Sequence, residues 1–341
     1  MKELWIDAGM PKNGTSARQV FLAKNRESLL KEGIDYIELI NLDDAKQGEI
    51  TSGNAAIFAR SLLDSNHQAY LDDHKKSYDK LLKYIKENNS SKFLISSEFL
   101  FFIPVQKYKQ LIADLNEINT TVKFIYYVRR QDQFLMSSYM QQVKRHGYTG
   151  YPETFILDSY QKNPYFNYYG IAKNFENTFG ENNLYTFIYE HTKKHPKGLI
   201  GHFIENILGY CPEWLEKEKS INTSPSPFEI KLLLIANKHK PRMVFSDFLI
   251  KNSIISGHSK EFSTHNILSP TLCKTILDYF SEQNKLYETR YAKGETFPSE
   301  IEEKYIDLKN IEIPMDEFLD LFTGYLVSYD KRIARLENLR N

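Results

Sequence analysis

A short apolar run at the start of the chain leads directly into a glycine-rich turn and then into a helical pattern. The run covers residues 4–6, the turn extends from Gly9 to Ser16, and apolar residues then recur at helical spacing. At such a junction the N–H groups of the turn and of the first helical turn point at one spot, and the helix dipole adds partial positive charge there. Lys12 adds a full positive charge, and glycine lets the backbone approach an anion closely. The sequence therefore predicts a phosphate-binding turn.

The position of the lysine separates two kinds of phosphate loop. In a Walker A loop, G-x-x-x-x-G-K-[ST], the lysine directly follows the second glycine. Gly9 and Gly14 have that separation here, but Thr15 stands at the lysine position, and Lys12 comes two residues before the second glycine. An ordinary strand–helix turn with a chance lysine is the alternative interpretation.

The order P-K-x-G-T resembles the 5′-phosphosulfate-binding loop of the sulfotransferases. This chain has Asn13 where that family usually has Ser or Thr, and Ser16 where it usually has Thr, so both positions keep a small polar side chain. The resemblance implies that 3′-phosphoadenosine 5′-phosphosulfate is the donor. It also implies that the donor is held by Lys12, Asn13, Gly14, Thr15, Ser16 and Ala17.

Strand-like and helix-like segments alternate along the first part of the chain. Short apolar, β-branched or aromatic runs predict strands at residues 4–7, 36–40, 92–96, 122–128 and 184–188. Helical patterns lie at 16–31, 70–88, 105–118 and 131–145, and later at 199–208, 228–237 and 271–286. This order predicts an α/β fold with a P-loop-like central parallel β-sheet flanked by helices and a mostly helical C-terminal part. Ligands are expected at the C-terminal ends of the strands.

Length and composition limit the class of protein. A chain of 341 residues can form one α/β domain with additions, or two domains. We expect a single domain over residues 1–341, with an α/β nucleotide-binding core at 1–210 and helical additions at 211–341 that could bind the acceptor. Lys plus Arg and Asp plus Glu number 44 each, so no overall charge attracts nucleic acid or an anionic membrane.

The two cysteines bear on the compartment. Cys211 and Cys273 provide neither a disulfide framework nor a zinc site, which fits a reducing compartment. The first strand begins within four residues of Met1, so no signal peptide is recognised, and no apolar run approaches the roughly 18 residues of a membrane span. We therefore expect a cytoplasmic protein.

A second cluster of candidate residues follows the predicted strand at 122–128. Arg129 ends that strand, and Ser137 lies eight residues later, about two turns into the next helix. A guanidinium and a hydroxyl at this spacing can face one phosphate. The pattern is similar to the 3′-phosphate-binding motif of the sulfotransferases. Arg130 and Ser138 have the same spacing and form the alternative pair, and an ordinary junction with solvated arginines is the interpretation without function.

A third segment, T-F-I-Y-E at 186–190, resembles the strand-end Y-E-D segment of the cytosolic sulfotransferases. The resemblance implies that Tyr189 contacts the adenine ring. His191 stands where that family often has Asp. His191 and His195 have i, i+4 spacing, but the segment lacks the Glu of H-E-x-x-H and carries two lysines between the histidines. We therefore predict no metal site.

The start G-M-P-K and the segment L-I-S-S-E at 94–98 are similar to the bacterial carbohydrate-type sulfotransferases. This resemblance implies a glycan or another small hydroxylated molecule as the acceptor. The C-terminal R-K-G motif of the cytosolic family, which anchors the 3′-phosphate, is not recognisable. Arg242 or Lys240 could replace it.

Sulfuryl transfer to a hydroxyl needs a base for the acceptor proton and positive charge for the departing phosphate. Lys12 and the turn N–H groups are expected to supply the charge. Carbohydrate-type members often use a Glu at the end of a central strand, which implies that Glu98 is the base; burial beside apolar neighbours would raise its pKa. A solvated strand-end or capping carboxylate is the alternative for Glu98, and His67 and His146 are the lesser candidates. Asp7, directly before the turn, is expected to fix it through hydrogen bonds.

Three functions remain compatible with these patterns. A sulfotransferase is favoured. A P-loop kinase or another nucleotide-binding protein is disfavoured, because the lysine is misplaced for a Walker A loop and no Asp ends a strand in a clear Walker B arrangement. A non-catalytic nucleotide-binding module is disfavoured by the presence of Lys12, Gly14 and Arg129 together. The acceptor and the oligomeric state are not encoded in local motifs.

Overall fold

The computed structural model describes residues 1–10, 12–49, 51–217, 225–240, 245–247, 249–250, 267–312 and 315–338, and these form two compact units. Unit 1 comprises Met1–Arg130, Asn167–Lys219 and Ser281–Pro298. Unit 2 comprises Gln131–Phe166, Ser220–Phe280 and Ser299–Asn341. Residues 131–166, which the sequence assigned to the α/β core, therefore group with C-terminal segments of the chain. The single domain expected from the sequence stays a prediction.

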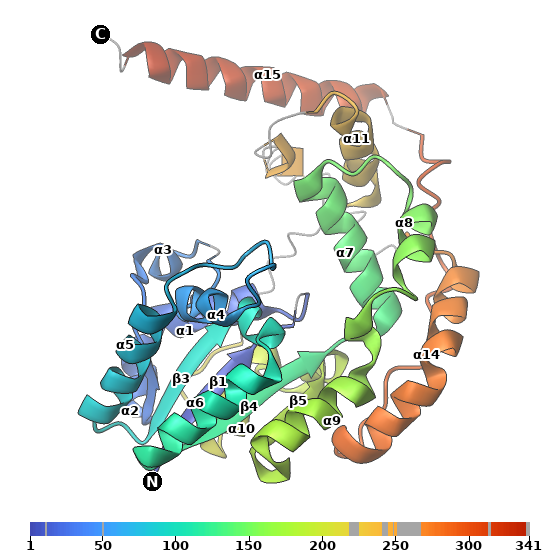
Figure 1. Ribbon diagram of the computed structural model, residues 1–341. Helices are drawn as coiled ribbons and strands as arrows, with labels where there is room; N and C mark the ends of the chain where they lie inside the picture. The colour runs from blue at the N-terminus through green and yellow to red at the C-terminus, as the bar shows by residue number, and fades with distance from the viewer. Residues whose placement is uncertain are drawn as a thin grey trace. The chain divides into compact units, whose positions relative to one another are not determined.

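Unit 1 contains the parallel sheet that the sequence predicts (Figure 1). Its five strands have the order β2-β3-β1-β4-β5, and every neighbouring pair is parallel. The strands are β1 (Lys2–Ala8), β2 (Ile34–Tyr36), β3 (Lys92–Ser97), β4 (Thr120–Val128) and β5 (Leu184–Ile188). The chain leaves β1 toward one side of the sheet, to β2, and leaves β4 toward the other, to β5. Because β1 and β4 are adjacent, a ligand crevice is expected beyond their C-terminal ends.

Different helices cover the two faces of the sheet. On one face, α1 (Thr15–Lys24), α2 (Arg26–Lys31) and α10 (Gly198–Leu208) pack over a buried cluster that includes Trp5 and Tyr127. Successive strand residues point to opposite faces. On the other face Phe124 contacts rings of two further helices, α6 (Val105–Glu117) and α9 (Tyr168–Phe179). A third helix of that face, α5 (His74–Glu87), contacts β3 through Tyr84 and Phe93.

Two sequence predictions for unit 1 are corrected. The single helix predicted at 16–31 is divided into α1 and α2, because the backbone N–H and the side-chain Nδ2 of Asn25 both donate to the Phe21 carbonyl and end α1. The strand predicted at 36–40 ends at Tyr36, and the backbone beyond it is held by a side chain. Asn54 Nδ2 donates to the carbonyls of Ile37 (2.7 Å) and Leu94 (3.1 Å).

The other predicted elements are confirmed with ends shifted by a few residues, whereas several observed helices, among them α9 and α15 (Met315–Asn338), were not predicted. Short elements complete unit 1: α3 (Asp43–Lys46), α4 (Ala56–Leu62), and the 3₁₀ turns η1 (Glu98–Phe102), η3 (Glu181–Asn183) and η4 (Tyr189–Lys194). Three of these, α4, η1 and η4, border the C-terminal ends of the strands, where the candidate residues lie. Cys211 and Cys273 are free thiols.

Unit 2 is helical in its described part. It contains α7 (Gln131–His146), α8 (Pro152–Ser159), η2 (Pro164–Phe166), α11 (Pro227–Asn237) and α15 (Met315–Asn338). Helix α14 (Pro270–Tyr291) begins in unit 2 and ends in unit 1. The core joins α7 to α11 through apolar side chains, and α11 starts with a capping box between Ser226 and Glu229. None of the helices in the described segments is long and apolar enough to cross a membrane.

Asn54 should be important for stability. It is fully buried, and its Oδ1 accepts from the Ser96 N–H (2.7 Å) while its Nδ2 reaches the two carbonyls. We expect Asn54→Ala to lower the free energy of unfolding by about 3 kcal/mol. The substitution leaves the buried carbonyls of Ile37 and Leu94 and the Ser96 N–H without the hydrogen bonds that Asn54 makes to them. Urea unfolding measures this.

Asn88→Ala is the matched control. Asn88 Nδ2 makes one bond, to the Tyr84 carbonyl at the end of α5, in a half-buried position. We expect a loss of less than about 1 kcal/mol there. Equal losses for the two variants would contradict the bridging role of Asn54.

Candidate active site

The turn between β1 and α1 is anchored through its carbonyl oxygens. Arg129 Nη1 donates to the Lys12 carbonyl (3.0 Å), and Arg18 Nη1 donates to the Asn13 carbonyl (2.8 Å). The Thr15 hydroxyl lies 3.5 Å from the Met10 carbonyl. The buried Arg18 and the half-buried Arg129 thus hold two consecutive peptide groups of the predicted phosphate turn.

Lys12 and Gly14 both adopt left-handed backbone conformations, with φ of 70° and 71°. At Gly14 a side chain is also excluded by space, since a Cβ there would lie 2.4 Å from Leu199 Cδ2 and 3.4 Å from the Tyr189 ring. Gly14 therefore lets α10 and the end of β5 approach the turn. Lys12 has a Cβ and adopts the same region at a conformational cost.

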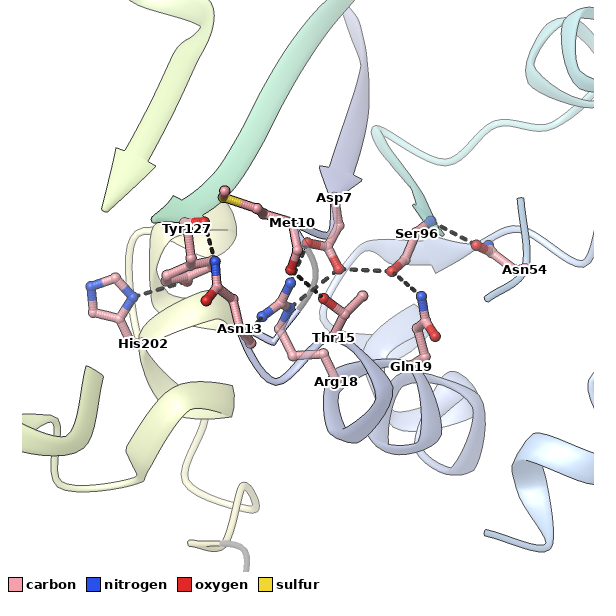
Figure 2. A network of polar contacts seen from close by, with 10 residues as sticks. All are labelled: Asp7, Met10, Asn13, Thr15, Arg18, Gln19, Asn54, Ser96, Tyr127 and His202. Atoms are coloured by element: carbon pink, nitrogen blue, oxygen red, sulfur yellow. Dashed lines mark hydrogen bonds and ion pairs between the residues drawn. The ribbon is translucent and has the colours of Figure 1, made fainter. Parts of the chain in front are cut away.

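Figure 2 shows the buried network beneath the turn. Arg18 Nε and Nη2 donate to the two carboxylate oxygens of Asp7, at 3.2 and 2.8 Å. Both side chains are fully buried. Asp7 Oδ2 also accepts from the Ser96 hydroxyl (2.7 Å), so the pair links β1, β3 and α1. The predicted role of Asp7 is confirmed: it holds the turn through Arg18.

The Asn13 side chain points into the protein. Its Nδ2 donates to the Tyr127 carbonyl near the end of β4, and its Oδ1 is buried without a hydrogen-bond partner. Behind it the Tyr127 hydroxyl lies 3.0 Å from His202 Nδ1 (Figure 2). Burial, followed by the nearby His195, lowers the pKa of His202 to about 4, so this ring is neutral at neutral pH. Asn13 ties the turn to β4, which leaves its backbone N–H as the group available to a ligand.

Arg129 contacts both the turn and Tyr189, the residue that follows β5. Its guanidinium lies over the Tyr189 ring, 5.4 Å from the centroid. Its Nε is buried, lies 4.0 Å from Glu190 Oε1 and has no hydrogen-bond partner. The structure therefore brings together Lys12, Gly14, Arg129 and Tyr189, and Arg129 retains a buried donor for an anion.

Glu190 belongs to this site, although the sequence analysis assigned it no role. Its Oε1 accepts from the Arg130 N–H (3.1 Å), and its Oε2 is buried without a partner. Burial raises the pKa of Glu190, while hydrogen bonds and both arginines oppose the rise. The carboxylate fixes the backbone at the end of β4 and faces Arg129. Its place beside Tyr189 in the Y-E segment was the available signal.

Arg129 and Arg130 point in different directions. Arg130 Nη1 donates to the Pro298 carbonyl (2.7 Å), in the last chain segment of unit 1. Arg129 donates to the turn. This difference favours Arg129 over Arg130 as the anion ligand.

Glu98 begins η1 directly after β3. The Ser97 hydroxyl caps the start of η1 by accepting a hydrogen bond from the Phe99 N–H (3.3 Å). Burial raises the pKa of the Glu98 carboxyl, and the charge of Lys12 partly offsets the rise. Glu98 thus lies within electrostatic reach of the lysine of the turn, in surroundings that favour its protonated form more than water does.

The remaining predicted residues are not joined to this cluster by described contacts. Ser16 and Ala17 lie in the first turn of α1, half-buried and exposed. Ser137, Ser138 and His146 are on α7 in unit 2, so the pairing of Ser137 with Arg129 stays a prediction. His67 Nδ1 accepts from the Ala69 N–H, which gives it a place in a local turn.

The two histidines at helical spacing have separate partners. His191 Nε2 lies 2.7 Å from the Thr296 carbonyl, and His195 Nε2 lies 3.0 Å from a Glu205 carboxylate oxygen. Across the described ranges, no group of three or more His, Cys, Asp or Glu side chains is arranged to hold a metal ion. Lys240 is in unit 2, whereas Arg242 lies outside the described residues.

Comparisons with known proteins show a partial similarity to a solved structure. No protein-family model matches the chain, and no curated protein matches it. Among solved structures, the chain is similar to the crystal structure of a sulfotransferase from Alicyclobacillus acidocaldarius. The TM-score is 0.42 and the sequence identity 13%, over 70% of this chain and 93% of the other.

Glu98 should make stability depend on pH. Folding raises the pKa of the Glu98 carboxyl, so the folded protein binds its proton more tightly than the unfolded chain does. The free energy of unfolding therefore falls as the pH rises from the ordinary carboxyl pKa through the raised one. We expect Glu98→Gln to raise the Tm at pH 7 by a few degrees. The gain should shrink below about pH 4, where the unfolded carboxyl is also protonated.

The control is Glu87→Gln on α5, where both partners of the Lys83 ion pair are exposed. It should change the Tm little at either pH. A lower Tm for Glu98→Gln at pH 7 would show that the charged carboxylate stabilises the fold.

Proposed function

We propose that this protein is a sulfotransferase that uses 3′-phosphoadenosine 5′-phosphosulfate and transfers its sulfuryl group to a hydroxyl or amine of a carbohydrate or related small molecule. The supporting observation is the convergence of four groups at the C-terminal ends of neighbouring strands. These groups are a cationic turn containing Lys12, a half-buried guanidinium of Arg129 whose buried Nε has no hydrogen-bond partner, the aromatic ring of Tyr189, and the carboxyl of Glu98.

The chain's residues fit the anionic groups of this donor. Arg129 Nε is a buried N–H without a hydrogen-bond partner, which an anion would satisfy, and the absence of a side chain at Gly14 lets the Tyr189 ring lie close to the turn. In the proposal the 3′-phosphate is bound by Arg129 with Ser137, and the Tyr189 ring packs against the adenine. The 5′ end is held by the segment Lys12, Asn13, Gly14, Thr15, Ser16 and Ala17, in which Asn13 contributes its backbone N–H.

Two residues would act on the transfer itself. The donor supplies the sulfuryl group: the bond from sulfur to the bridging oxygen breaks as the acceptor oxygen or nitrogen bonds to sulfur. Lys12 and the turn N–H groups stabilise the negative charge left on the phosphate. Glu98 accepts the proton of the acceptor; a carboxyl whose pKa is raised by burial is suited to this near neutral pH. The positive charge comes from Lys12 and amides, so the proposal involves no metal.

The acceptor is proposed to be a small molecule or glycan. The balance of 44 basic and 44 acidic residues makes an extended nucleic-acid surface unexpected. The two free thiols fit a reducing compartment, and we propose that the protein acts in the cytoplasm.

Ligand binding tests the proposal first. We expect adenosine 3′,5′-bisphosphate at about 100 times its Kd to add about 2.7 kcal/mol of stability, seen as a Tm increase of several degrees. ADP with Mg²⁺, tested in parallel, should give a smaller shift. A shift with ADP and Mg²⁺ alone would instead favour a P-loop kinase or another nucleotide-binding protein.

Arginine variants assign the site. Arg129→Lys should remove most of the shift with the bisphosphate, because a lysine cannot bond the Lys12 carbonyl and an anion in the same fork geometry. Arg130→Lys is the matched neighbour, and its shift should persist. The reverse result would assign the phosphate to Arg130.

Glu98 can then be tested in turnover. With an acceptor found in a panel of sugars and phenols, Glu98→Gln should lower kcat about 10²- to 10⁴-fold. Its Kd for adenosine 3′,5′-bisphosphate should remain near that of the wild type. His67→Gln is the control, and a larger loss of kcat there would make His67 the base.

A further inference from the structure

We propose that Arg18 is a positioning residue that sets the direction of the amide donors in the phosphate turn. This inference rests on the proposed function, because it assumes that the turn binds a phosphate group. Arg18 itself is fully buried, so in this proposal it holds the turn and does not contact the ligand.

The argument starts from the planar peptide bond. In a trans peptide the C=O of one residue and the N–H of the next point in opposite directions. No cis peptide bond occurs among the described residues. Arg18 Nη1 draws the Asn13 carbonyl inward at 2.8 Å, so the N–H of Gly14 points outward from Arg18. In the same way, the bond from Arg129 to the Lys12 carbonyl directs the N–H of Asn13.

The peptide group between Asn13 and Gly14 needs such a hydrogen bond, because the residues on either side of Asn13 adopt left-handed backbone conformations. Lys12 and Gly14 have φ near 70°, and the peptide between Asn13 and Gly14 adjoins a glycine that can adopt many conformations. Without an inward partner for the Asn13 carbonyl, that peptide group could rotate and present its oxygen to the ligand. A carbonyl oxygen in a phosphate site would repel the ligand.

The guanidinium is itself immobilised. Arg18 Nε and Nη2 donate to the Asp7 carboxylate, and Nη1 donates to the Asn13 carbonyl of the turn. The guanidinium lies 4.9 Å from the centroid of the Tyr127 ring and 5.4 Å from that of Phe203. A planar fork of donors can make these contacts together, whereas a lysine ammonium acts as a single point charge.

The test separates positioning from stability. Arg18→Lys keeps a cation beside Asp7 but lacks the fork. In the double variant Asp7→Leu/Arg18→Met, apolar side chains replace the ion pair; such replacements often preserve stability. Leu111→Ala, in a buried position of α6, is the control for a destabilised sheet with an unchanged turn. Kd is measured by calorimetry for adenosine 3′,5′-bisphosphate and for AMP, well below each Tm.

We expect Arg18→Lys and the double variant to bind both nucleotides about tenfold to a hundredfold more weakly, including where the Tm is preserved. The ratio of the two Kd values should stay at its wild-type value, because Arg18 acts on the turn. Arg129→Lys should change that ratio. Leu111→Ala should lower the Tm and leave both Kd values unchanged. Unchanged Kd values in both Arg18 variants, or a loss of affinity in the Leu111 control equal to theirs, would overturn the proposal.

A second measurement uses the wild-type chain and covers the case in which the variants do not fold. With ¹⁵N-glycine labelling, the Gly14 amide resonance should shift on addition of adenosine 3′,5′-bisphosphate, while that of Gly180, at the end of α9, should not. An unchanged Gly14 resonance in the saturated protein would overturn the inference.

The outcomes also distinguish the inference from the proposed function. If the wild type binds ADP and not the bisphosphate, the sulfotransferase proposal fails, and the Arg18 variants are judged by their Kd for ADP. If the wild type binds none of adenosine 3′,5′-bisphosphate, AMP and ADP, both fail together.

Discussion

The buried ion pair between Asp7 and Arg18 is the interaction on which the candidate site depends. It joins the central strand β1 to α1, the helix that follows the turn, and it therefore connects the two ends of the turn. Removing two charges from water is costly, and the cost is recovered only when hydrogen bonds satisfy the buried groups. Here both carboxylate oxygens, three guanidinium nitrogens and the Ser96 hydroxyl have partners. The shape of the turn is therefore set by buried groups of the core.

Preorganisation extends from this pair to the other candidate residues. Arg129 holds the next carbonyl of the turn and also faces Tyr189 and Glu190, so the ends of β4 and β5 are tied to the turn. Groups fixed in this way need little reordering when charge develops beside them. Glu98 lies on the β3 side, and its pKa reflects burial first and Lys12 second. Basic and acidic side chains thus lie near each other at the C-terminal end of the sheet.

Local patterns predicted the strands and the residues at their ends, because apolar runs and strand-end glycine and arginine are signals within a few positions. They did not reveal Arg18, which lies in a helical pattern where a charged residue is ordinarily solvated. The one available signal was an aspartate directly after an apolar strand. The inward direction of Asn13 and the bridging by Asn54 depend on carbonyls far away in sequence, at Tyr127 and Leu94. The grouping of residues 131–166 with C-terminal segments has no local signal either.

The interleaving of the two units governs how the chain can be made and divided. The last segment of unit 1, Ser281–Pro298, supplies partners for the sheet unit: Tyr287 contacts the Thr186 hydroxyl, Thr296 contacts His191, and Pro298 accepts from Arg130. During synthesis the first 210 residues are made before these partners. Until residues 281–298 are added, the Thr186 side of β5 lacks its contact with Tyr287. A fragment cut at residue 210 would keep the phosphate turn and lose that cover. Unit 1 is compact in space and divided in sequence, so no single cut of the chain releases it whole.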